Sequence, residues 1–378
     1  MPPIKTFTRI KTNGAARLGS FTTAHGVFDT PNFMPVGTRA SVKGVDCERL
    51  REAGTQITLV NTYHLWLRPG PSVVRALGDI HRFMNWSGPV LSDSGGFQVF
   101  SLEGMRSLTE AGVEFRSHID GAKCFLSPEV SIQIQEELGV DIAMVLDECP
   151  KAGQDEAAIE RSLDLTLRWA RRSLEARRND TTAIFGITQG GLFPHLRERA
   201  ARELAALPFD GYAIGGLSVG ERKDDMYGVL TYHPAHLPAD KIRYLMGVGT
   251  PEDLVEAVYR GVDLFDCVMP TRAGRFGRAF VRGAEVQINI KNSRFVTETA
   301  PLDPTCRCVA CRSYSRGYIN HLFRVGEMLG PQLVSIHNVT HYLELMAAIR
   351  GAIAADSFAE LYRAEKARWR TAPSEPAA

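Results

Sequence analysis

The chain has 378 residues, 44% of them hydrophobic, and its 44 basic and 43 acidic residues give a formal net charge of +1. This length fits one large domain with additions or two modest domains, and a nearly neutral chain is no general polyanion binder, so contact with nucleic acid would need a local basic patch. No run of 18 apolar residues predicts a membrane span and the N-terminus has no apolar signal core, so we expect a cytoplasmic protein without membrane partners.

In chain order, residues 1–45 are predicted to form a β-hairpin region that leads into the fold, because Asn13-Gly14 is a turn signal within a stretch rich in Gly, Thr and Phe. From residue 46 a rhythm of strands and helices begins. Apolar runs predict buried strands at 57–60, 89–92, 142–146, 184–187, 212–214, 243–246 and 263–265. Ser127 is a predicted N-cap, with Pro128 at the first helical position and Gly139 past the helix end.

Repeated strand–helix units predict an α/β protein with a parallel sheet. Polar and glycine-rich residues follow at least five of the strands. An open doubly wound sheet would concentrate its chemistry at one switch point, whereas a (β/α)8 TIM barrel gathers all its strand ends at one site. We therefore predict a barrel core over 46–285, a zinc-binding subdomain inserted near the C-terminus at 286–340, and a C-terminal helix and tail at 341–378.

Three of the seven cysteines, Cys306, Cys308 and Cys311, are crowded into six residues. An odd count with one tight cluster favours reduced thiols and a metal ion over disulfides. Zn²⁺ takes four Cys or His ligands in structural sites, so one histidine is missing. His337 is the best candidate, with His321 and His341 as alternatives. The simpler interpretation is three ordinary buried cysteines.

Three aspartates, Asp93, Asp147 and Asp266, each follow an apolar strand. A lone aspartate there is most often a helix N-cap, but each of these three lies beside Gly or Cys and not at the start of a helix-forming run. Paired carboxylates suit chemistry at an anomeric carbon. The Gln189 amide, the bare backbone of 215–216 and the Phe97 ring would complete a purine-like pocket, although turn chemistry and core packing are the alternatives for Gln189 and Phe97.

Basic residues gather after Asp266. The stretch 271–278 contains three arginines, Arg282 follows, and Arg307, Arg312 and Arg316 lie in or beside the cysteine loop. Arginine suits phosphate and base-edge contacts. A solvated charged loop is the common alternative, but a strip shared by both regions would give a nearly neutral protein one positive face.

Together these motifs resemble one family over nearly the whole chain: bacterial tRNA-guanine transglycosylase, of the queuine tRNA-ribosyltransferase family. The resemblance rests on 93–98 (DSGGFQ), 147–149 (DEC), 186–190 (GITQG), 215–221 (GGLSVGE), 265–272 (FDCVMPTR) and the cysteine cluster. It implies a barrel with a zinc subdomain. It also implies that guanine at the anticodon wobble position of tRNAs with GUN anticodons (aspartate, asparagine, histidine and tyrosine) is exchanged for 7-aminomethyl-7-deazaguanine, on the route to queuosine.

The resemblance also implies roles. Asp266 is expected to be the nucleophile that forms a covalent glycosyl-enzyme, and Asp93 the residue that handles protons. The residues expected to hold the base are Asp93, Ser94, Gly95, Gly96, Phe97, Asp147, Gln189, Gly216 and Leu217. Those expected to contact tRNA are Gly247, Val248, Gly249, Thr250, Pro251, Glu252, Asp253, Thr271, Arg272, Ala273, Gly274 and Arg275. One structural Zn²⁺ on Cys306, Cys308, Cys311 and His337, and a homodimer, complete the expectation.

Local details bear on the subtype. Val219 and Cys149 resemble the bacterial pattern that takes the small base, Phe97 stands where some members have tyrosine, and 150–153 differs from the usual proline-rich loop. Two competing hypotheses remain. A non-catalytic tRNA-binding subunit of the same family should lack one of the paired aspartates, and a zinc-bearing barrel glycosidase would leave the arginine loop and the glycine-rich pocket unexplained.

Overall fold

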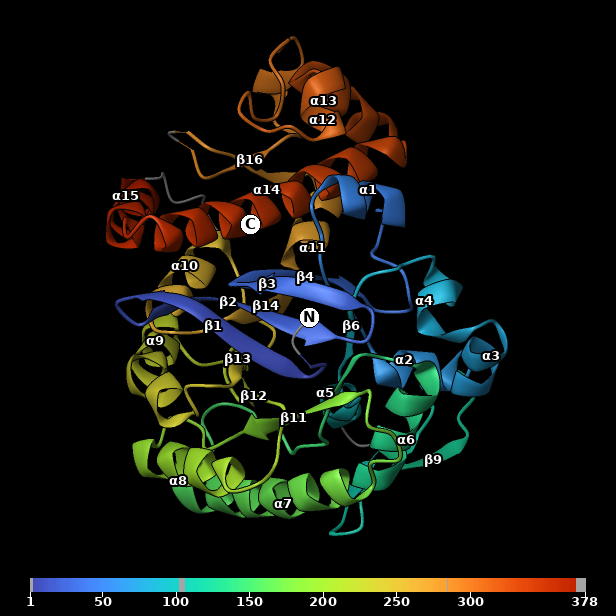
Figure 1. Ribbon diagram of the computed structural model, residues 1–378. Helices are drawn as coiled ribbons and strands as arrows, with labels where there is room; N and C mark the ends of the chain where they lie inside the picture. The colour runs from blue at the N-terminus through green and yellow to red at the C-terminus, as the bar shows by residue number, and fades with distance from the viewer. Residues whose placement is uncertain (1–2, 102–105, 284, 372–378) are drawn as a thin grey trace.

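The computed structural model describes residues 3–101, 106–283 and 285–371 (Figure 1). Within them, eight parallel strands close into a barrel, which confirms the predicted fold class. In spatial order the barrel strands are β10 (Ile142–Met144), β11 (Ala183–Thr188), β12 (Gly211–Ile214), β13 (Ile242–Leu245), β14 (Leu264–Cys267), β4 (Asn32–Gly37), β5 (Thr58–Val60) and β6 (Val90–Ser92).

Sequence patterns identify every barrel strand except β4, which lies within 1–45. Its sequence contains Pro35, which has no backbone N–H and argues against a central strand. The strand nevertheless pairs with β14 on one side and β5 on the other. Pro35 is the last residue aligned with β14, opposite Cys267, so its missing donor falls where that pairing ends.

Helices surround the barrel and connect its strands (Figure 1). They are α1 (Cys47–Glu52), α2 (Thr62–Leu67), α3 (Pro71–Ala76), α4 (Asp79–Met84), α5 (Gly96–Phe100), α6 (Pro128–Leu138), α7 (Glu156–Glu175), α8 (Pro194–Ala205), α9 (Lys223–Tyr232) with the 3-10 turn η1 (His233–His236), and α10 (Pro251–Tyr259). The predicted caps of α6 are confirmed: the Ser127 side chain accepts a hydrogen bond from the Val130 amide, and Gly139 ends the helix with a φ of 78°.

A three-stranded antiparallel sheet covers the amino end of the barrel: β1 (Thr6–Asn13), β2 (Ala16–Thr23) and β3 (Gly26–Thr30). Its first hairpin turns at Asn13-Gly14 as predicted. The buried Arg17 on β2 forms an ion pair with Asp263 and donates to the carbonyls of Ala239 and Lys241. Because these groups precede β14 and β13, the sheet covers the amino end and leaves the carboxyl end free.

A second small sheet, not predicted from the sequence, lies between β6 and α6. It consists of β7 (Arg106–Leu108), β8 (Val113–Arg116) and β9 (Lys123–Leu126). The buried ring of Phe115 packs against Tyr63 and Trp66 of α2, with ring centroids 5.7 Å apart in both pairs. This contact holds the sheet against the helices that follow β5.

The C-terminal part begins after β14 and has its own apolar cluster. Its elements are α11 (Met269–Arg275), β15 (Arg278–Phe280), β16 (Gln287–Asn289), the 3-10 turn η2 (Ser293–Phe295), α12 (Val309–Ser313), α13 (Arg316–Val325), α14 (Leu329–Ala354) and α15 (Phe358–Thr371). The helical stretch expected at about 340–370 is two helices, because the chain turns near Asp356, which has a φ of 58°. Helix α14 crosses residue 340 and runs between the barrel and α12–α13 (Figure 1).

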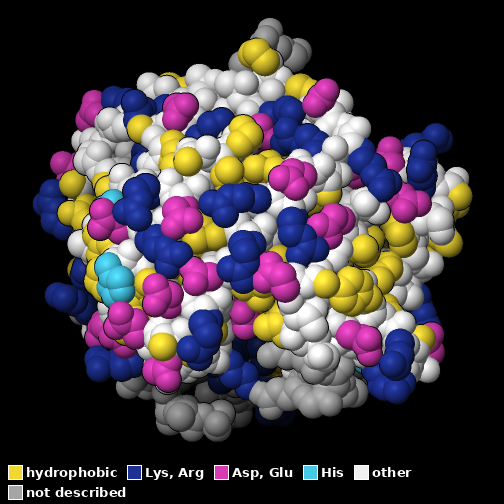
Figure 2. Space-filling view, turned by 90° about the horizontal axis from the view of Figure 1, so that it is seen from below, with side chains coloured by type: hydrophobic (Ala, Val, Ile, Leu, Met, Phe, Trp, Pro, Cys, Tyr) yellow, Lys and Arg dark blue, Asp and Glu magenta, His cyan; other side chains and the backbone are white. Residues whose placement is uncertain are grey.

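The face formed by α7 and α8 carries both signs of charge. Figure 2 shows Lys and Arg side chains interspersed with Asp and Glu on the underside of the molecule. Arg199 alone contacts Glu160, Asp164 and Glu203, at 3.2, 2.5 and 2.9 Å. This face therefore offers no single-sign field to a polyanion. Among the described helices, none is long and apolar enough to cross a membrane.

Candidate active site and metal centre

The carboxyl ends of the barrel strands surround a cavity of about 390 Å³. Each predicted strand end contributes to it, so residues far apart in sequence share one wall. The predicted residues that line it are Asp93, Ser94, Gly95, Phe97, Asp147, Gln189, Gly216, Leu217, Gly247 and Asp266. Gly96 lies behind the wall, where a Cβ would come within 3.0 Å of Leu146 and 3.2 Å of the Asp147 carbonyl.

Asp93, just after β6, is held by four hydrogen bonds. Its Oδ1 accepts from the backbone amides of Thr62 and Gly95 at 2.8 and 3.2 Å, and its Oδ2 accepts from the side-chain amides of Asn61 and Gln98 at 2.5 and 2.9 Å. Burial raises the pKa of Asp93 to about 6, although these donors oppose the shift. The Asp93 carboxylate is thus held rigidly, with protein donors at all four of its hydrogen-bond acceptor positions. Its raised pKa lets it take up a proton near neutral pH.

Asp266, in β14, is held through one oxygen only. Its Oδ1 accepts from the Tyr244 hydroxyl at 2.5 Å and from the Gly247 amide at 2.8 Å. Among the described residues, no donor bonds to Oδ2. Burial raises the pKa of this carboxyl as well. One oxygen of Asp266 is therefore anchored while the other keeps its lone pairs for a ligand in the cavity.

Asp147 and Gln189, which follow β10 and β11, form a polar pair across the barrel from Asp266. Gln189 Nε2 donates to Asp147 Oδ2 at 2.6 Å, while within the described chain the buried Gln189 Oε1 has no hydrogen-bond partner. Burial raises the pKa of Asp147 to about 6, and the nearby charges of Glu148 and Asp93 add to the shift. The adjacent Gly216 has a φ of +63°, and a Cβ there would collide with Gln189 Oε1. The absence of a side chain at Gly216 therefore leaves space for the Gln189 amide group.

Arg197 of α8 fixes the loops on this wall from behind. Its guanidinium is completely buried and donates to the carbonyls of Gly191, Thr188, Gly215 and Gly216 at 2.7, 3.3, 2.8 and 3.2 Å. These carbonyls lie at the end of β11 and in the turns after β11 and β12. One side chain therefore sets the conformation of both glycine-rich segments.

Glu221 shapes the same loop from its far end. Its carboxylate accepts from the backbone amides of Ser218 and Val219, the second at 3.0 Å. The two thiols near the cavity, Cys149 and Cys267, have pKa values raised to about 12 by burial. They are neutral at physiological pH and are poor nucleophiles compared with the ionisable Asp266.

The stretches predicted to contact RNA both follow barrel strands, but half of their twelve residues are buried. The buried ones are Val248, Pro251, Asp253, Thr271, Ala273 and Gly274, whereas Gly247 and Arg272 are exposed and Gly249, Thr250, Glu252 and Arg275 are half-buried. Asp253 completes the capping box of α10 with the N-cap Thr250, accepts from the Tyr227 hydroxyl at 2.6 Å and pairs with Lys223 at 3.0 Å. Arg272 and Arg275 are therefore the charged groups in these stretches that a polyanion could reach.

The four residues predicted to bind zinc come together. Cys306, Cys308, Cys311 and His337 are all buried, and their ligand atoms lie within 4.8 Å of one another. His337 Nε2 lies 2.6 Å from the Phe280 carbonyl, which can only accept, so the proton is on Nε2 and Nδ1 faces Cys311 Sγ at 3.3 Å. Hydrogen bonds with Cys306 and Cys308 raise the pKa of the Cys311 thiol, whereas the pKa of Cys308 is lowered by its hydrogen bonds with Cys306 and Cys311. A cation would be needed to hold all three sulfurs as thiolates. A metal ion fits this donor set.

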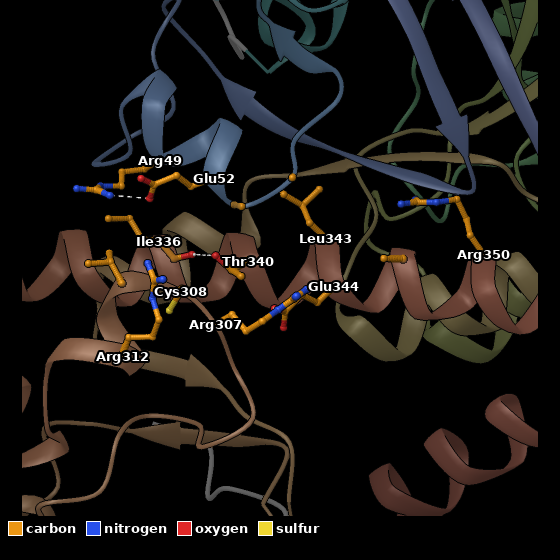
Figure 3. Close-up of a pocket in the computed structure, with 14 residues that line it drawn as sticks. Arg49, Glu52, Arg307, Cys308, Arg312, Ile336, Thr340, Leu343, Glu344 and Arg350 are labelled. Carbon is orange, nitrogen blue, oxygen red and sulfur yellow. Dashed lines mark hydrogen bonds and ion pairs between the residues drawn. The ribbon is translucent and has the colours of Figure 1, made fainter.

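His337 lies within α14, and the cysteine loop packs against this helix. Figure 3 shows Cys308 facing α14 with Arg307 and Arg312 on either side of it. The neighbouring cavity, of about 570 Å³, lies between α1, the cysteine loop and α14. The buried His341 points elsewhere, with its ring 6.3 Å from that of His337, so the alternative ligand is not supported.

The two predicted basic regions meet at one carboxylate. Glu344 of α14 lies 2.8 Å from Arg282 and 3.7 Å from Arg307. The segment after Asp266 and the cysteine loop are therefore neighbours, as the idea of a shared basic strip requires. Glu344 offsets part of the charge, while the Arg307 side chain remains 88% exposed.

Sequence reasoning missed several residues that complete the site. Asn61 and Gln98 fill the acceptor sites of Asp93, Tyr244 holds Asp266, and Arg197 anchors the loops. Asn61 carried a usable signal, because it directly follows the strand at 57–60. Tyr244 and Arg197 carried none, since a strand tyrosine and an arginine in a charged helix are both ordinary.

One cavity at the carboxyl end of this closed (β/α)8 barrel is lined by buried carboxylates, an amide and glycine backbone. This arrangement is typical of enzymes with a TIM-barrel fold. The family model described as queuine tRNA-ribosyltransferase matches residues 12–371. A relative of that name from Dinoroseobacter shibae is 54% identical over 93% of this chain and 94% of its own. Another from Aromatoleum aromaticum is 53% identical over 95% and 98% of the two chains. The chain belongs to the queuine tRNA-ribosyltransferase family.

Because Gly216 is closely surrounded, adding one methyl group there should weaken ligand binding in the cavity. Gly216→Ala should weaken binding of a purine-like base by at least about tenfold, because the Cβ collides with Gln189 Oε1 and the φ of +63° is strained for alanine. Isothermal titration with guanine measures this. Gly121→Ala is the matched control, since Gly121 has a φ of +74° but no atom within 4 Å of the position that a Cβ would take. Equal effects of the two changes would show that strain alone, not the pocket, is responsible.

The pKa of Asp147 predicts a pH-dependent gain in stability on neutralisation. Asp147→Asn should raise the free energy of unfolding by up to about 3 kcal/mol above pH 6, since moving a pKa from 3.8 to about 6 makes the buried charge costly there. Between pH 6 and 4 the folded wild type takes up the proton, so the gain shrinks, and below pH 4 it vanishes. Urea unfolding at several pH values tests this, with the exposed Asp180→Asn as control; a gain that persists at pH 3.5 would contradict it.

Proposed function

We propose that this chain is a tRNA-guanine transglycosylase that exchanges guanine at the anticodon wobble position of GUN-anticodon tRNAs for 7-aminomethyl-7-deazaguanine, through a covalent glycosyl-enzyme, as a step of queuosine biosynthesis. Family membership and the activity for which the relatives are named support the reaction class. The contrast between two aspartates in one cavity is the observation that carries the mechanism.

This contrast assigns different tasks to the two carboxylates. A nucleophile needs a free lone pair, and Asp266 keeps Oδ2 free while Tyr244 and Gly247 fix Oδ1. Asp93 has all its acceptor positions filled, so it can receive a proton only after Asn61 or Gln98 releases it. We therefore assign nucleophilic attack to Asp266 and proton transfer to Asp93.

In the first half-reaction, Asp266 Oδ2 attacks the ribose anomeric carbon and the bond to guanine breaks, while the departing guanine nitrogen takes a proton from the protonated Asp93 carboxyl. In the second, the deazaguanine base loses its ring-nitrogen proton and attacks the same carbon, which frees the Asp266 carboxylate. A pKa of about 6 lets Asp93 hold or release that proton at neutral pH. One N-glycosidic bond replaces another, so no nucleotide energy source is required.

The Asp147–Gln189 wall suits the polar edge of such a base. A guanine edge presents N–H donors beside a carbonyl acceptor. The Asp147 carboxylate can accept from the donors, and the free Gln189 Oε1 adds a further acceptor. Gly216 and Leu217 bring the backbone of their loop to the same cavity. Phe97, 61% exposed at the mouth, offers a face on which a base can stack.

The base must leave the nucleic-acid stack to enter this cavity, which favours an anticodon loop as the substrate. Arg272, exposed just beyond β14, and Arg275 are the side chains that we assign to RNA phosphates, while the segment from Gly247 to Asp253 contributes backbone and positions α10. The near-zero net charge fits a local contact of this kind.

We assign Zn²⁺ to the Cys306, Cys308, Cys311 and His337 cluster. Four protein donors of this kind complete a tetrahedron, so the ion would be structural and would leave no position for a substrate. The ion would cross-link the cysteine loop to α14. A homodimer also belongs to the proposal, and the stacked Tyr314 and Tyr318, the second 42% exposed on α13, offer an apolar contact for it.

The main prediction concerns base exchange. Incubation with radiolabelled guanine and unmodified tRNA should label the tRNA, and Asp266→Asn should reduce the rate by about 1000-fold or more while tRNA binding persists, because only the attacking oxygen is lost. Asp180→Asn, an exposed change, should keep full activity. No incorporation by folded, zinc-loaded protein would instead support a non-catalytic tRNA-binding subunit, and wild-type turnover by Asp266→Asn would remove the proposed nucleophile.

The zinc assignment predicts a coupled loss. Cys308→Ser should lower the metal content measured by mass spectrometry, lower the melting temperature and weaken tRNA binding together, because the ion holds the cysteine loop on α14. Cys124→Ser, a half-buried cysteine outside the cluster, is the control. A Cys308→Ser protein with unchanged melting temperature that loses only base exchange would contradict a structural role.

A further inference from the structure

The exposed face of α11 carries an aromatic side chain that the proposed base exchange does not use. Phe276, at the C-cap of this helix, is 63% exposed and directly follows the half-buried Arg275. A single exposed phenylalanine needs no explanation by itself. The side chains that share its face, however, connect it to the mouth of the cavity and carry positive charge.

Helical spacing places four side chains on this face, at positions i, i+4, i+7 and i+8: Val268, Arg272, Arg275 and Phe276. They lie within about 100° of one another around the helix axis. The flanking residues continue the helical turns, because the Arg272 amide donates to the Val268 carbonyl at 2.8 Å and the Phe276 amide donates to the carbonyl three residues earlier at 3.0 Å. The opposite face of α11 is closed by the contact of Gly274 with α14.

This face begins at the cavity and runs away from it. Val268 is 45% exposed and lines the cavity together with Asp266. At a rise of about 1.5 Å per residue, Phe276 lies about 12 Å along the helix from Val268. That length corresponds to roughly three to four stacked base steps of about 3.4 Å on one strand. An RNA whose target base enters the cavity would therefore bring a base about three nucleotides away to the level of Phe276.

The two arginines on this face have no partner among the described residues. Arg282, a few residues further along the chain, forms an ion pair with Glu344 at 2.8 Å, but no described group forms an ion pair or a hydrogen bond with the side chain of Arg272 or Arg275. Within the described chain the buried Arg275 Nη1 is unsatisfied, although buried donors are nearly always hydrogen-bonded. Cationic donors in this state suit an anionic ligand such as a phosphate.

The backbone that carries Phe276 is fixed on both sides. The Gly277 amide donates to the Gly274 carbonyl at 3.1 Å, and the Gly277 carbonyl accepts from the Ile290 amide at 2.8 Å. A Cβ at Gly277 would lie 3.2 Å from Cγ of the exposed Lys291, so a third basic side chain stands next to this segment. An aromatic residue on an ordered backbone loses little conformational entropy when a ligand stacks on it.

We propose that Phe276 stacks on an unpaired base of the anticodon loop, about three nucleotides from the base that is exchanged, while Arg272 and Arg275 hold the intervening phosphates. Aromatic rings bind splayed bases by stacking, and basic side chains beside them follow the backbone. The inference rests on the proposed function for the identity of the RNA and adds a contact outside the cavity. Because stacking tolerates any base, Phe276 contributes affinity and holds the loop in position.

Fluorescence anisotropy with a labelled anticodon stem-loop RNA and the full-length protein tests this contact. Phe276→Ala removes an exposed side chain, so we expect it to fold, and it should weaken RNA binding by about 5- to 150-fold, the equivalent of the ~1–3 kcal/mol of one base–aromatic stack. Phe276→Trp should restore the wild-type affinity, because it keeps a stacking face. Ile10→Ala, at a 64% exposed position on β1 at the opposite end of the barrel, is the matched control and should bind as wild type does.

Two further readouts separate stacking from charge. Arg272→Ala should reduce the slope of log affinity against log salt concentration by about one, since one phosphate contact is lost, whereas Phe276→Ala should weaken binding without changing this slope. A fluorescent purine analogue, placed at one unpaired loop position at a time, should report stacking at one position on binding, and Phe276→Ala should abolish that signal while Phe276→Trp keeps it.

Three results would overturn the inference. Wild-type RNA affinity of Phe276→Ala would remove the stacking contact and leave the proposed base exchange untouched. A change in the sedimentation of Phe276→Ala without a change in RNA affinity would assign this face to a second copy of the chain. A wild-type protein that binds no stem-loop RNA at all would contradict the proposed function together with the inference that rests on it.

Discussion

The close approach of α11 and α14 is the contact on which the open end of the barrel depends. A Cβ at Gly274 would lie 2.7 Å from the Ser335 backbone, so only glycine allows the two helices to meet this closely. Helix α11 begins directly after the strand that carries Asp266, and His337 follows Ser335 by two residues on α14. The strand that carries Asp266 and the cluster of Cys306, Cys308, Cys311 and His337 are therefore linked structurally through one helix contact.

The same helix stabilises the neighbouring loops. Asn338 donates to the carbonyls of Pro270 and Arg278, both at 2.9 Å, and Tyr342 donates to the Gly249 carbonyl at 3.0 Å. These carbonyls lie in the segments that follow β14 and β13. Because buried backbone acceptors without partners are costly, α14 both satisfies these segments and fixes their course. The metal ion assigned to His337 would then reinforce the element that holds the rim of the cavity.

Burial and hydrogen bonding together differentiate the carboxylates at this rim. Burial alone raises the pKa of Asp93, Asp147 and Asp266 in the same direction. What distinguishes them is the number and placement of donors: four fill the acceptor sites of Asp93, whereas the two on Asp266 leave one oxygen free. Similar residues at the ends of similar strands thus acquire different chemistry from their neighbours.

The sequence by itself determined the barrel class, the strands with continuous apolar runs, the capped helix α6 and the cysteine cluster, because each depends on neighbours close in the chain. Local patterns could not find β4, whose Pro35 argues against a strand. They named His337 as the best fourth ligand but did not settle the choice against His321 and His341. Tertiary structure alone decided that choice, the role of Arg197 and the contact of Asp266 with Tyr244. The physical reason is that these partners lie on different strands and helices, and only closure of the barrel brings them within bonding distance.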